Sequence, residues 1–217
     1  MTEFIVHTIP GSPFGRAVLA TLEEKGASYA LRRVAMRTPK HLALHPFGRI
    51  PILQHGDFKL YETQAILRFL DRVLPQPPLT PADAKGAARM DQLMNVCDWY
   101  LIQGVGNIIG FQRVVGPRLM GLTPDEAAIE AAMPRAHAVF DQLARELGDS
   151  GYFVGEAVTL ADILLASHVD FFRGLPEWTP LVAPHANLVS WLERMNARPS
   201  MIATTWERVE AMDKVAA

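Results

Sequence analysis

The chain has 217 residues, 49% of them hydrophobic, with 21 basic and 23 acidic side chains and a formal net charge of -2. This size suits one large globular domain or two small ones, and the charge balance lacks the basic excess typical of nucleic-acid-binding proteins. No apolar stretch approaches the roughly 20 residues of a membrane helix, and the single cysteine, Cys97, excludes an internal disulfide and a cysteine-based metal cluster. We expect a cytoplasmic protein without nucleic-acid or membrane partners.

The first seventy-odd residues mix strand and helix patterns. Phe14, Val18 and Leu22 recur every four residues, which predicts a helix directly after the turn-forming residues 10–13. His55-Gly56-Asp57 separates two short apolar runs and predicts a hairpin. The predicted order is a strand at 4–6, a helix to about 25, a strand at 29–34, an irregular segment, hairpin strands at 52–53 and 58–60, and a helix at 66–74.

Four prolines between residues 75 and 81 predict a stiff, exposed connector, and hence a domain boundary. Almost everything after it has helical spacing. A long helix that includes Met90 to Leu101 is expected to fray or bend among Gly104, Gly106 and Gly110. The capping box at 123–126, with Thr123 first, predicts a new helix, which Pro134 is expected to kink. Further helices are predicted near 160–173, 185–196 and 199–212.

Ser12 and Pro13 are a favoured pair at the start of a helix, so a cap is the simple interpretation of Ser12. The cap nevertheless lies between a predicted first strand and first helix, where ligands often dock in α/β folds. A thiolate placed there would be stabilised by the helix dipole and by the serine hydroxyl. Both interpretations remain open at this point.

Two further segments have a structural and a functional interpretation. Pro51 opens a strand after residues 46–50, and a cis bond there would let the backbone of Ile50 pair with an extended peptide ligand. Glu62 and Thr63 directly precede a helical stripe; they either cap that helix or hold the ammonium and carboxylate of an amino-acid head group.

Taken together, these segments resemble the cytosolic glutathione transferase family over essentially the whole chain. Residues 12–16 are similar to its Ser-Pro-Phe segment, and residues 45–51 to Asn-Pro-Phe-Gly-x-Val-Pro, with His45 in place of asparagine. Residues 57–63 are close to the signature that ends in Glu-Ser, with Thr63 for serine, and residues 153–162 match the helical domain's Thr/Ser-x-x-Asp box. The serine makes the theta-like and phi-like classes most similar, here in a protein expected to be bacterial.

The resemblance implies a glutathione transferase fold, which joins an α/β thioredoxin-like domain to an all-helical domain. We expect the first at 1–76, a proline-rich linker at 77–84 and the second at 85–217. The resemblance implies that Ser12 donates a hydrogen bond to the sulfur of glutathione. Glutathione is then the co-substrate, and no other cofactor is expected. The resemblance also implies that Ile50, before cis-Pro51, binds the cysteinyl backbone and that Glu62 and Thr63 bind the γ-glutamyl end.

Other roles implied by the resemblance are less specific. Lys40 and His41 are candidates for binding the glycine carboxylate, and equally for solvated surface residues. Arg49 is a further possible contact. Phe14, Phe111 and Trp206 are candidates for the electrophile site, although aromatic side chains in helices are usually core. Thr159 and Asp162 are predicted to cap a buried helix, and Cys97 to lie in the core.

The predicted activity is conjugation of the glutathione thiolate to a small hydrophobic electrophile, in a detoxifying homodimer without a metal site. His7, His137, His168 and His185 lack the spacing of metal ligands. Glutathione-dependent peroxidase, dehalogenase or isomerase activity on the same scaffold remains an alternative, and so does a non-enzymatic binding module of this fold.

Overall fold

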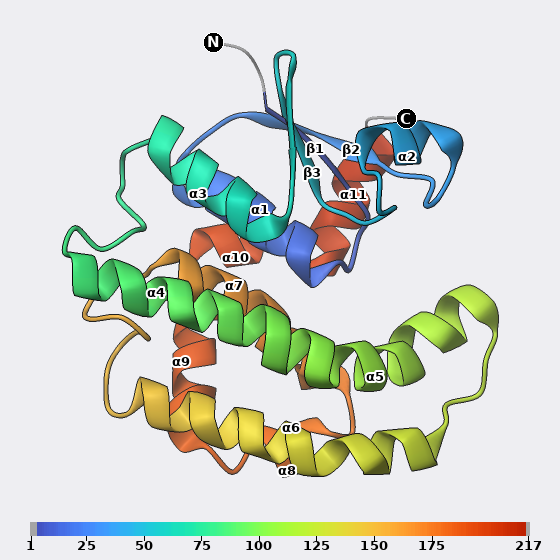
Figure 1. Ribbon diagram of the computed structural model, residues 1–217, viewed down its shortest axis with the longest axis vertical. Coiled ribbons are helices and arrows are strands. Elements are labelled where there is room, and N and C mark those ends of the chain that lie inside the picture. Colours follow the sequence, from blue (N-terminus) through green and yellow to red (C-terminus); the bar gives the residue numbers. More distant parts are fainter. Residues whose placement is uncertain (1–3, 216–217) are drawn as a thin grey trace. The chain divides into compact units, whose positions relative to one another are not determined.

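The computed structural model describes residues 4–215, apart from the side chains of Leu119 and of residues 213–215 (Figure 1). The chain divides into two compact units. The first consists of Met1–Thr80 together with Met195–Ala217, and the second of Pro81–Arg194. The division falls inside the segment that the sequence predicts as a linker. The C-terminal residues, predicted to belong to the helical domain, instead have their contacts in the first unit.

A four-stranded sheet forms the centre of the first unit, in the order β2-β1-β3-β4. Strands β1 and β2 are parallel, whereas β3 is antiparallel to both β1 and β4. The strands predicted from the sequence are confirmed, including the hairpin. Their bounds are β1 Phe4–Thr8, β2 Tyr29–Arg33, β3 Ile52–His55 and β4 Phe58–Tyr61.

Helices α1 (Pro13–Glu24) and α3 (Thr63–Val73) pack against each other in this unit and bury their apolar stripes. Val73, in the last turn of α3, is 42% exposed. The segment predicted as irregular contains a further helix, α2 (Pro39–Leu44). Its start is stabilised by the Thr38 hydroxyl, which accepts a hydrogen bond from the His41 N–H at 3.3 Å.

The C-terminal segment of this unit forms two short helices, α10 (Pro199–Ala203) and α11 (Trp206–Val215), where one helix is predicted. Helix α10 packs on α1 and α11 packs on β2. The carboxylate of Glu24 accepts hydrogen bonds from Arg198 Nε at 2.7 Å and from Ser200 Oγ at 2.5 Å. This partly buried ion pair ties α10 to the end of α1.

The proline-rich connector is not exposed throughout, contrary to the prediction. Leu79 is 1% exposed, and its N–H donates to the Asp71 carboxylate at 3.0 Å. Lys25, whose side chain is fully buried, pairs with Asp71 at 2.5 Å and also donates to the Pro77 carbonyl. Burial would raise the pKa of Asp71, but hydrogen bonds from Lys25, Thr80 and Leu79 hold it below its ordinary value. The connector is therefore anchored to the first unit.

The second unit is helical in all its regular elements. The helix predicted to fray or bend near Gly104, Gly106 and Gly110 does not fray: it continues through these glycines, with wider π-helical turns on either side of α5. Cys97 is fully buried, as predicted. The helices are α4 Ala84–Val96, η1 Cys97–Gly106, α5 Asn107–Gly110, η2 Phe111–Met120, α6 Glu126–Leu147, α7 Leu160–Phe171, η3 Phe172–Gly174, α8 Trp178–Leu181 and α9 Ala186–Asn196, the last reaching into the C-terminal segment.

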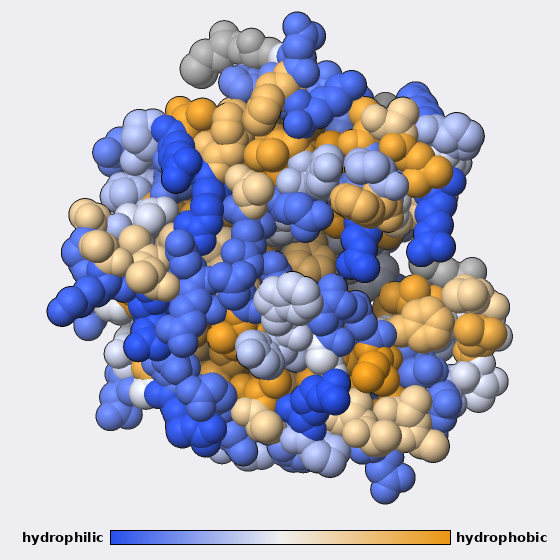
Figure 2. All heavy atoms as spheres, viewed as in Figure 1, coloured by the Kyte–Doolittle hydropathy of each residue, from blue (hydrophilic) through white to orange (hydrophobic). Residues whose placement is uncertain are grey.

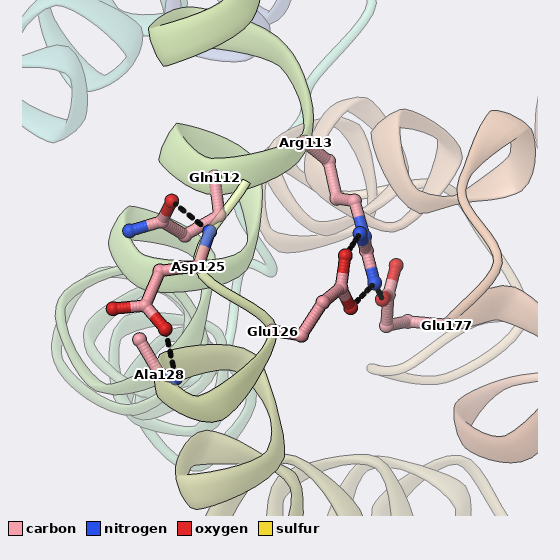
Figure 3. A network of polar contacts seen from close by, with 6 residues as sticks. All are labelled: Gln112, Arg113, Asp125, Glu126, Ala128 and Glu177. Carbon is pink, nitrogen blue, oxygen red and sulfur yellow. Dashed lines mark hydrogen bonds and ion pairs between the residues drawn. The ribbon is translucent and has the colours of Figure 1, made fainter. Parts of the chain in front are cut away.

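The N-cap of α6 is Asp125, two residues after the predicted cap Thr123 (Figure 3). The Asp125 carboxylate accepts from the Ala128 N–H at 3.0 Å, and the Asp125 N–H donates to Gln112 Oε1 at 2.9 Å. Asp125 thus caps the first turn of α6 in place of Thr123. The helix then runs through Pro134 to Leu147.

Arg113 joins three elements of this unit, as Figure 3 shows. Its guanidinium donates to both carboxylate oxygens of Glu126, at 2.5 and 2.8 Å, and through Nε to Glu177 Oε1 at 2.8 Å. These hydrogen bonds raise the pKa of Arg113 further above its ordinary value. The charged bridge links η2 to the start of α6 and to the turn before α8.

The face drawn in Figure 2 carries hydrophilic residues over much of its area and apolar residues in separate patches. Within residues 4–215, no helix has both the length and the apolar character needed to cross a bilayer.

Candidate functional site

The register of the sheet brings four loops to one edge. Thr8 lies beside Arg33, at the ends of the parallel strands β1 and β2. On the other side His7 pairs with Ile52, at the start of β3, and Ile52 pairs with Tyr61, at the end of β4. The residues that follow β1, β2 and β4 and those that precede β3 therefore share this edge. We call it the loop edge of the sheet.

Ser12 lies at the loop edge as the N-cap of α1. Its backbone is extended, and its half-buried hydroxyl oxygen accepts from the Gly15 N–H at 3.1 Å. Within the described part of the chain the hydroxyl accepts this hydrogen bond and donates none, so its proton is available to a ligand. The first turn of α1 contains no acidic residue, which leaves the positive end of the helix dipole uncompensated there. An anion is favoured at this position.

Gly15 allows α1 to approach the sheet closely. A Cβ atom at this position would lie 2.1 Å from the Thr8 hydroxyl oxygen, at the end of β1. Any larger residue would push the N-terminus of α1 away from the loop edge. The glycine therefore sets the position of Ser12, three residues earlier.

His41 is not available to bind a carboxylate, in contrast to one of its predicted roles. It is 1% exposed; its Nδ1 accepts from the Arg37 N–H at 2.9 Å, and its Nε2 lies 2.9 Å from the Arg49 carbonyl oxygen. Because Nδ1 accepts from an amide, it carries no proton, and Nε2 is the donor. Both nitrogens are thus engaged with the backbone. His41 joins the loop after β2 to the loop that leads to Ile50.

His45 makes contacts within the turn that leads to Ile50. Its Nδ1 accepts from the Phe47 N–H at 3.3 Å, and its ring is tilted against that of Tyr61, with 4.5 Å between the ring centroids. Burial lowers the pKa of His45, an effect that the nearby carboxylate of Glu62 opposes. The turn is followed by Ile50, whose peptide bond to Pro51 is cis.

Glu62 and Thr63 lie at the loop edge at the start of α3. Glu62 is exposed, its φ is +70°, and its side chain makes no capping hydrogen bond to α3. Thr63 is 7% exposed and is the first residue of the helix. The cap interpretation therefore does not account for Glu62, whose carboxylate remains available beside the free amides of the first turn.

Backbone strain also gathers at this edge. Within the described residues, the non-glycine residues with positive φ are Glu62 and Arg37, at +70° and +59°. Such conformations cost about 1–3 kcal/mol each and cluster at ligand sites. Arg37 is exposed in the loop after β2 and was missed by sequence reasoning, since nothing in the residues around it signals a left-handed conformation. Lys40, in α2, and Arg49, before Ile50, are also exposed.

The three candidate electrophile residues divide between the two units. Phe14 is half-buried in the first turn of α1, and Trp206, at the start of α11, lies against Gly11, next to Ser12. Phe111 belongs to the second unit, where it is half-buried in η2 and its ring lies near Gly116.

Thr159 and Asp162 make the hydrogen bonds of a helix cap in the second unit. The Asp162 carboxylate accepts from the Thr159 N–H at 2.9 Å and its hydroxyl at 2.8 Å, from the Phe153 N–H at 2.9 Å and from Trp191 Nε1 at 3.0 Å. Asp162 is fully buried, and burial raises its pKa although all four donors oppose the shift. Every strong acceptor position is used within the protein, so this cap has no capacity for a ligand.

Two other classes of site find no support in the described residues. Burial raises the pKa of the Cys97 thiol well above its ordinary value, so it is a poor nucleophile. Among residues 4–215, no group of three or more histidine, cysteine, aspartate or glutamate side chains is arranged to hold a metal ion.

Comparison with known proteins agrees with this geometry. Residues 2–72 match the glutathione S-transferase N-terminal domain, and residues 106–199 match the glutathione S-transferase C-terminal domain. Glutathione S-transferase 3 of Zea mays is 30% identical over 211 residues, which cover 94% of each chain. The structure of glutathione S-transferase III in its apo form is 30% identical, with a TM-score of 0.83 over 93% of this chain and 95% of that one.

A second solved structure, of glutathione S-transferase-I bound with lactoylglutathione, has a TM-score of 0.82 over 97% of this chain and 99% of that one. At 23% identity this likeness concerns the fold. The fold, the two matched domains and the relative that is similar over almost its full length lead to one conclusion: the chain belongs to the glutathione S-transferase family.

Proposed function

We propose that this protein is a glutathione transferase in which Ser12 activates the thiol of glutathione for attack on a small hydrophobic electrophile. The position of Ser12 carries the proposal: a hydroxyl with an available proton, at an uncompensated helix N-terminus, on the loop edge that also holds Ile50 and Glu62. The serine at this position makes the chain most similar to the theta-like and phi-like classes of the family. Glutathione is the co-substrate, and no other cofactor takes part.

The mechanism follows from the environment of the sulfur. A free thiol has a pKa of about 8.5, so only a few per cent is thiolate at neutral pH. The Ser12 hydroxyl donates to the thiolate and the α1 dipole stabilises its charge, and both effects lower the pKa. Lowering the thiol pKa by one unit corresponds to about 1.4 kcal/mol of preference for the thiolate. The sulfur then forms a bond to the electrophilic carbon, and the leaving group departs with its electron pair.

The remaining contacts orient glutathione along the loop edge. The Glu62 carboxylate receives the ammonium group of the γ-glutamyl end, and Thr63 with the first amides of α3 receives its carboxylate. The backbone of Ile50, before Pro51, pairs with the cysteinyl residue. The glycine carboxylate is bound by an exposed cation, Lys40 or Arg49.

Arg37 is a third cation for the glycine carboxylate, in the same loop that His41 holds in place. Phe14 and Trp206 line the side of the site from which the electrophile approaches. Both belong to the unit that contains Ser12. Phe111, in the other unit, stays a prediction from the sequence.

Glutathione conjugation tests the proposal directly. We expect the purified protein to bind immobilised glutathione, and to transfer it to an activated aromatic halide with turnover that rises with pH as the bound thiol ionises. The same enzyme should be assayed with an epoxide, an isothiocyanate and a hydroperoxide, which separates conjugation from peroxidase, dehalogenase or isomerase chemistry. Binding without turnover on any electrophile would indicate a binding module and contradict the proposal.

We also propose that the protein is a cytoplasmic homodimer. Trp99 and Tyr100, next to each other in η1, are 68% and 62% exposed, which is unusual for large aromatic side chains in a monomer. Light scattering at micromolar concentration should give about twice the 24.0 kDa chain mass. A single species at the chain mass would contradict this.

A further inference from the structure

The C-terminal helix of the chain reaches the turn that carries Ser12. Gly11 has a φ of +79°, and a Cβ atom added to it would lie 2.6, 2.6 and 2.7 Å from three consecutive carbons of the Trp206 indole. The six-membered ring therefore covers the α-carbon of the residue directly before Ser12. Both belong to the first unit.

Other contacts in the first unit hold α11, the helix that carries Trp206, in place. One turn further along α11, Val209 is only 4% exposed, and the helix packs on β2. The Tyr29 hydroxyl, in β2, lies 4.0 Å from the sulfur of Met212. At its other end α11 follows α10, which the Glu24–Arg198 ion pair ties to α1. The helix that carries the indole is thus anchored both before and after Trp206.

On the helix side this turn is held by Ser12, whose carbonyl accepts from the Arg16 N–H at 2.8 Å and whose hydroxyl accepts from the Gly15 N–H at 3.1 Å. The indole packs on its other side, at Gly11. Glycine gives its backbone more freedom than any other residue, and Gly11 stands directly before Ser12. The Ser12 N–H to Ile9 carbonyl hydrogen bond, at 3.3 Å, is long. The direction of the Ser12 hydroxyl depends on this backbone, whereas Ile50 and Glu62 lie on other loops. Packing against a rigid aromatic ring restricts the turn at a point next to the reacting sulfur.

We propose that Trp206 is a positioning residue for Ser12: its indole holds Gly11 so that the serine hydroxyl points at the glutathione sulfur. This inference rests on the proposed function. Loss of the ring should leave glutathione binding almost unchanged, because the Ile50 and Glu62 loops are intact. It should weaken the hydrogen bond to the thiolate, which raises the pKa of the bound thiol and lowers kcat rather than raising KM for glutathione.

The test compares three variants with the wild-type enzyme. Trp206→Ala removes the ring, Trp206→Phe keeps a six-membered ring, and Val209→Ala removes buried volume from the same helix without touching Gly11. Thiolate absorbance of the glutathione complex, followed against pH, gives the thiol pKa. Steady-state kinetics give kcat and KM for glutathione, and thermal unfolding measures how far each variant is destabilised.

We expect Trp206→Ala to raise the thiol pKa by about half a unit or more, to lower kcat about fivefold, and to change KM for glutathione less than about twofold. Trp206→Phe should recover part of both effects. Val209→Ala should melt earlier yet titrate like the wild type. If Trp206→Ala does not fold, Trp206→Phe decides, since its thiol pKa should still lie above that of the wild type.

Coincident thiol titrations for the wild type and the folded Trp206 variants would overturn the inference. An equal pKa shift in Val209→Ala would also overturn it, because the effect would then come from general docking of α11. A wild-type complex whose thiol titrates like free glutathione is a different result: it contradicts the proposed activation by Ser12 itself.

Discussion

Two helices of this protein begin at side-chain caps with opposite surroundings: Ser12 in α1 of the first unit, and Thr159 with Asp162 in α7 of the second. The Ser12 hydroxyl is half-buried, accepts from Gly15 and keeps its proton available. Asp162 is fully buried and accepts from four donors within the protein. A cap with spare hydrogen-bonding capacity at an open edge can bind a ligand, whereas a cap whose acceptors are all used can only stabilise the fold.

Of the changes considered, we expect substitution of Asp162 to have the largest effect on stability. Asp162→Ala leaves four donors without an acceptor inside the core, so unfolding by urea should show a loss of about 3–5 kcal/mol. Activity per folded molecule should stay the same. Asp162→Asn, which keeps the size and one acceptor oxygen, should cost less. Unchanged stability combined with lost activity would place Asp162 in the active site instead.

Helix α7, which Thr159 and Asp162 cap, also contains the buried His168, which should make stability depend on pH. Burial lowers the pKa of His168 from 6.5 to about 4, so between these values the unfolded chain binds more protons than the folded one. Stability should therefore fall as the pH is lowered through this window, by about 3 kcal/mol from this residue.

His168→Gln should flatten the stability profile between pH 4 and 6.5, measured as urea midpoints, while the exposed His137→Gln serves as its control. Parallel profiles for His168→Gln and the wild type would show that His168 does not titrate in the way its burial predicts.

Ser12→Ala tests whether the cap of α1 also serves a ligand. The variant should bind glutathione through the Ile50 and Glu62 loops, but its bound thiol should titrate at higher pH and turnover should fall by more than about tenfold. The α1 dipole persists, so part of the pKa depression should remain. Equal titration curves and equal turnover would leave Ser12 as a cap similar to Thr159.

Glu62 gives the smallest of these effects and separates binding from chemistry. Glu62→Gln removes the charge that faces the ammonium group, which should raise the dissociation constant of glutathione about tenfold while the bound complex reacts at nearly the wild-type rate. Calorimetry provides the constant, and Glu130→Gln, at an exposed position of α6, is a matched control. A wild-type constant would remove Glu62 from the site.

Much of the first unit could be predicted because its signals are local. The strands, the hairpin and helices α1 and α3 follow apolar periodicity and turn residues that are close in the sequence. Helix α2 was missed because it has only 6 residues, too few to show an apolar period, and its one strong signal is the Thr38–Pro39 start. The cap at Asp125 was misplaced by two residues because Thr123 and Asp125 are both good N-caps, and the hydrogen bond to Gln112, in the preceding helical segment, favours the second.

The candidate site was predictable in type but not in detail. The residues after β1, before β3 and after β4 were identified by their resemblance to a family, and the register of the sheet brings their loops to one edge. The role of His41 was not predictable, because an imidazole can bind a carboxylate or bridge two loops. Only its two backbone partners, Arg37 and Arg49, distinguish these possibilities. The strained backbone of Arg37 has no sequence signal.

By itself the sequence determined the local elements, the helical character of the second unit and the residue types of the site, since these depend on neighbours within a few positions. The tertiary structure decided which of two similar caps has capacity for a ligand. It also decided that α11 returns to the first unit and places Trp206 on Gly11. Burial and long-range contacts depend on residues far apart in the chain, which no local pattern records.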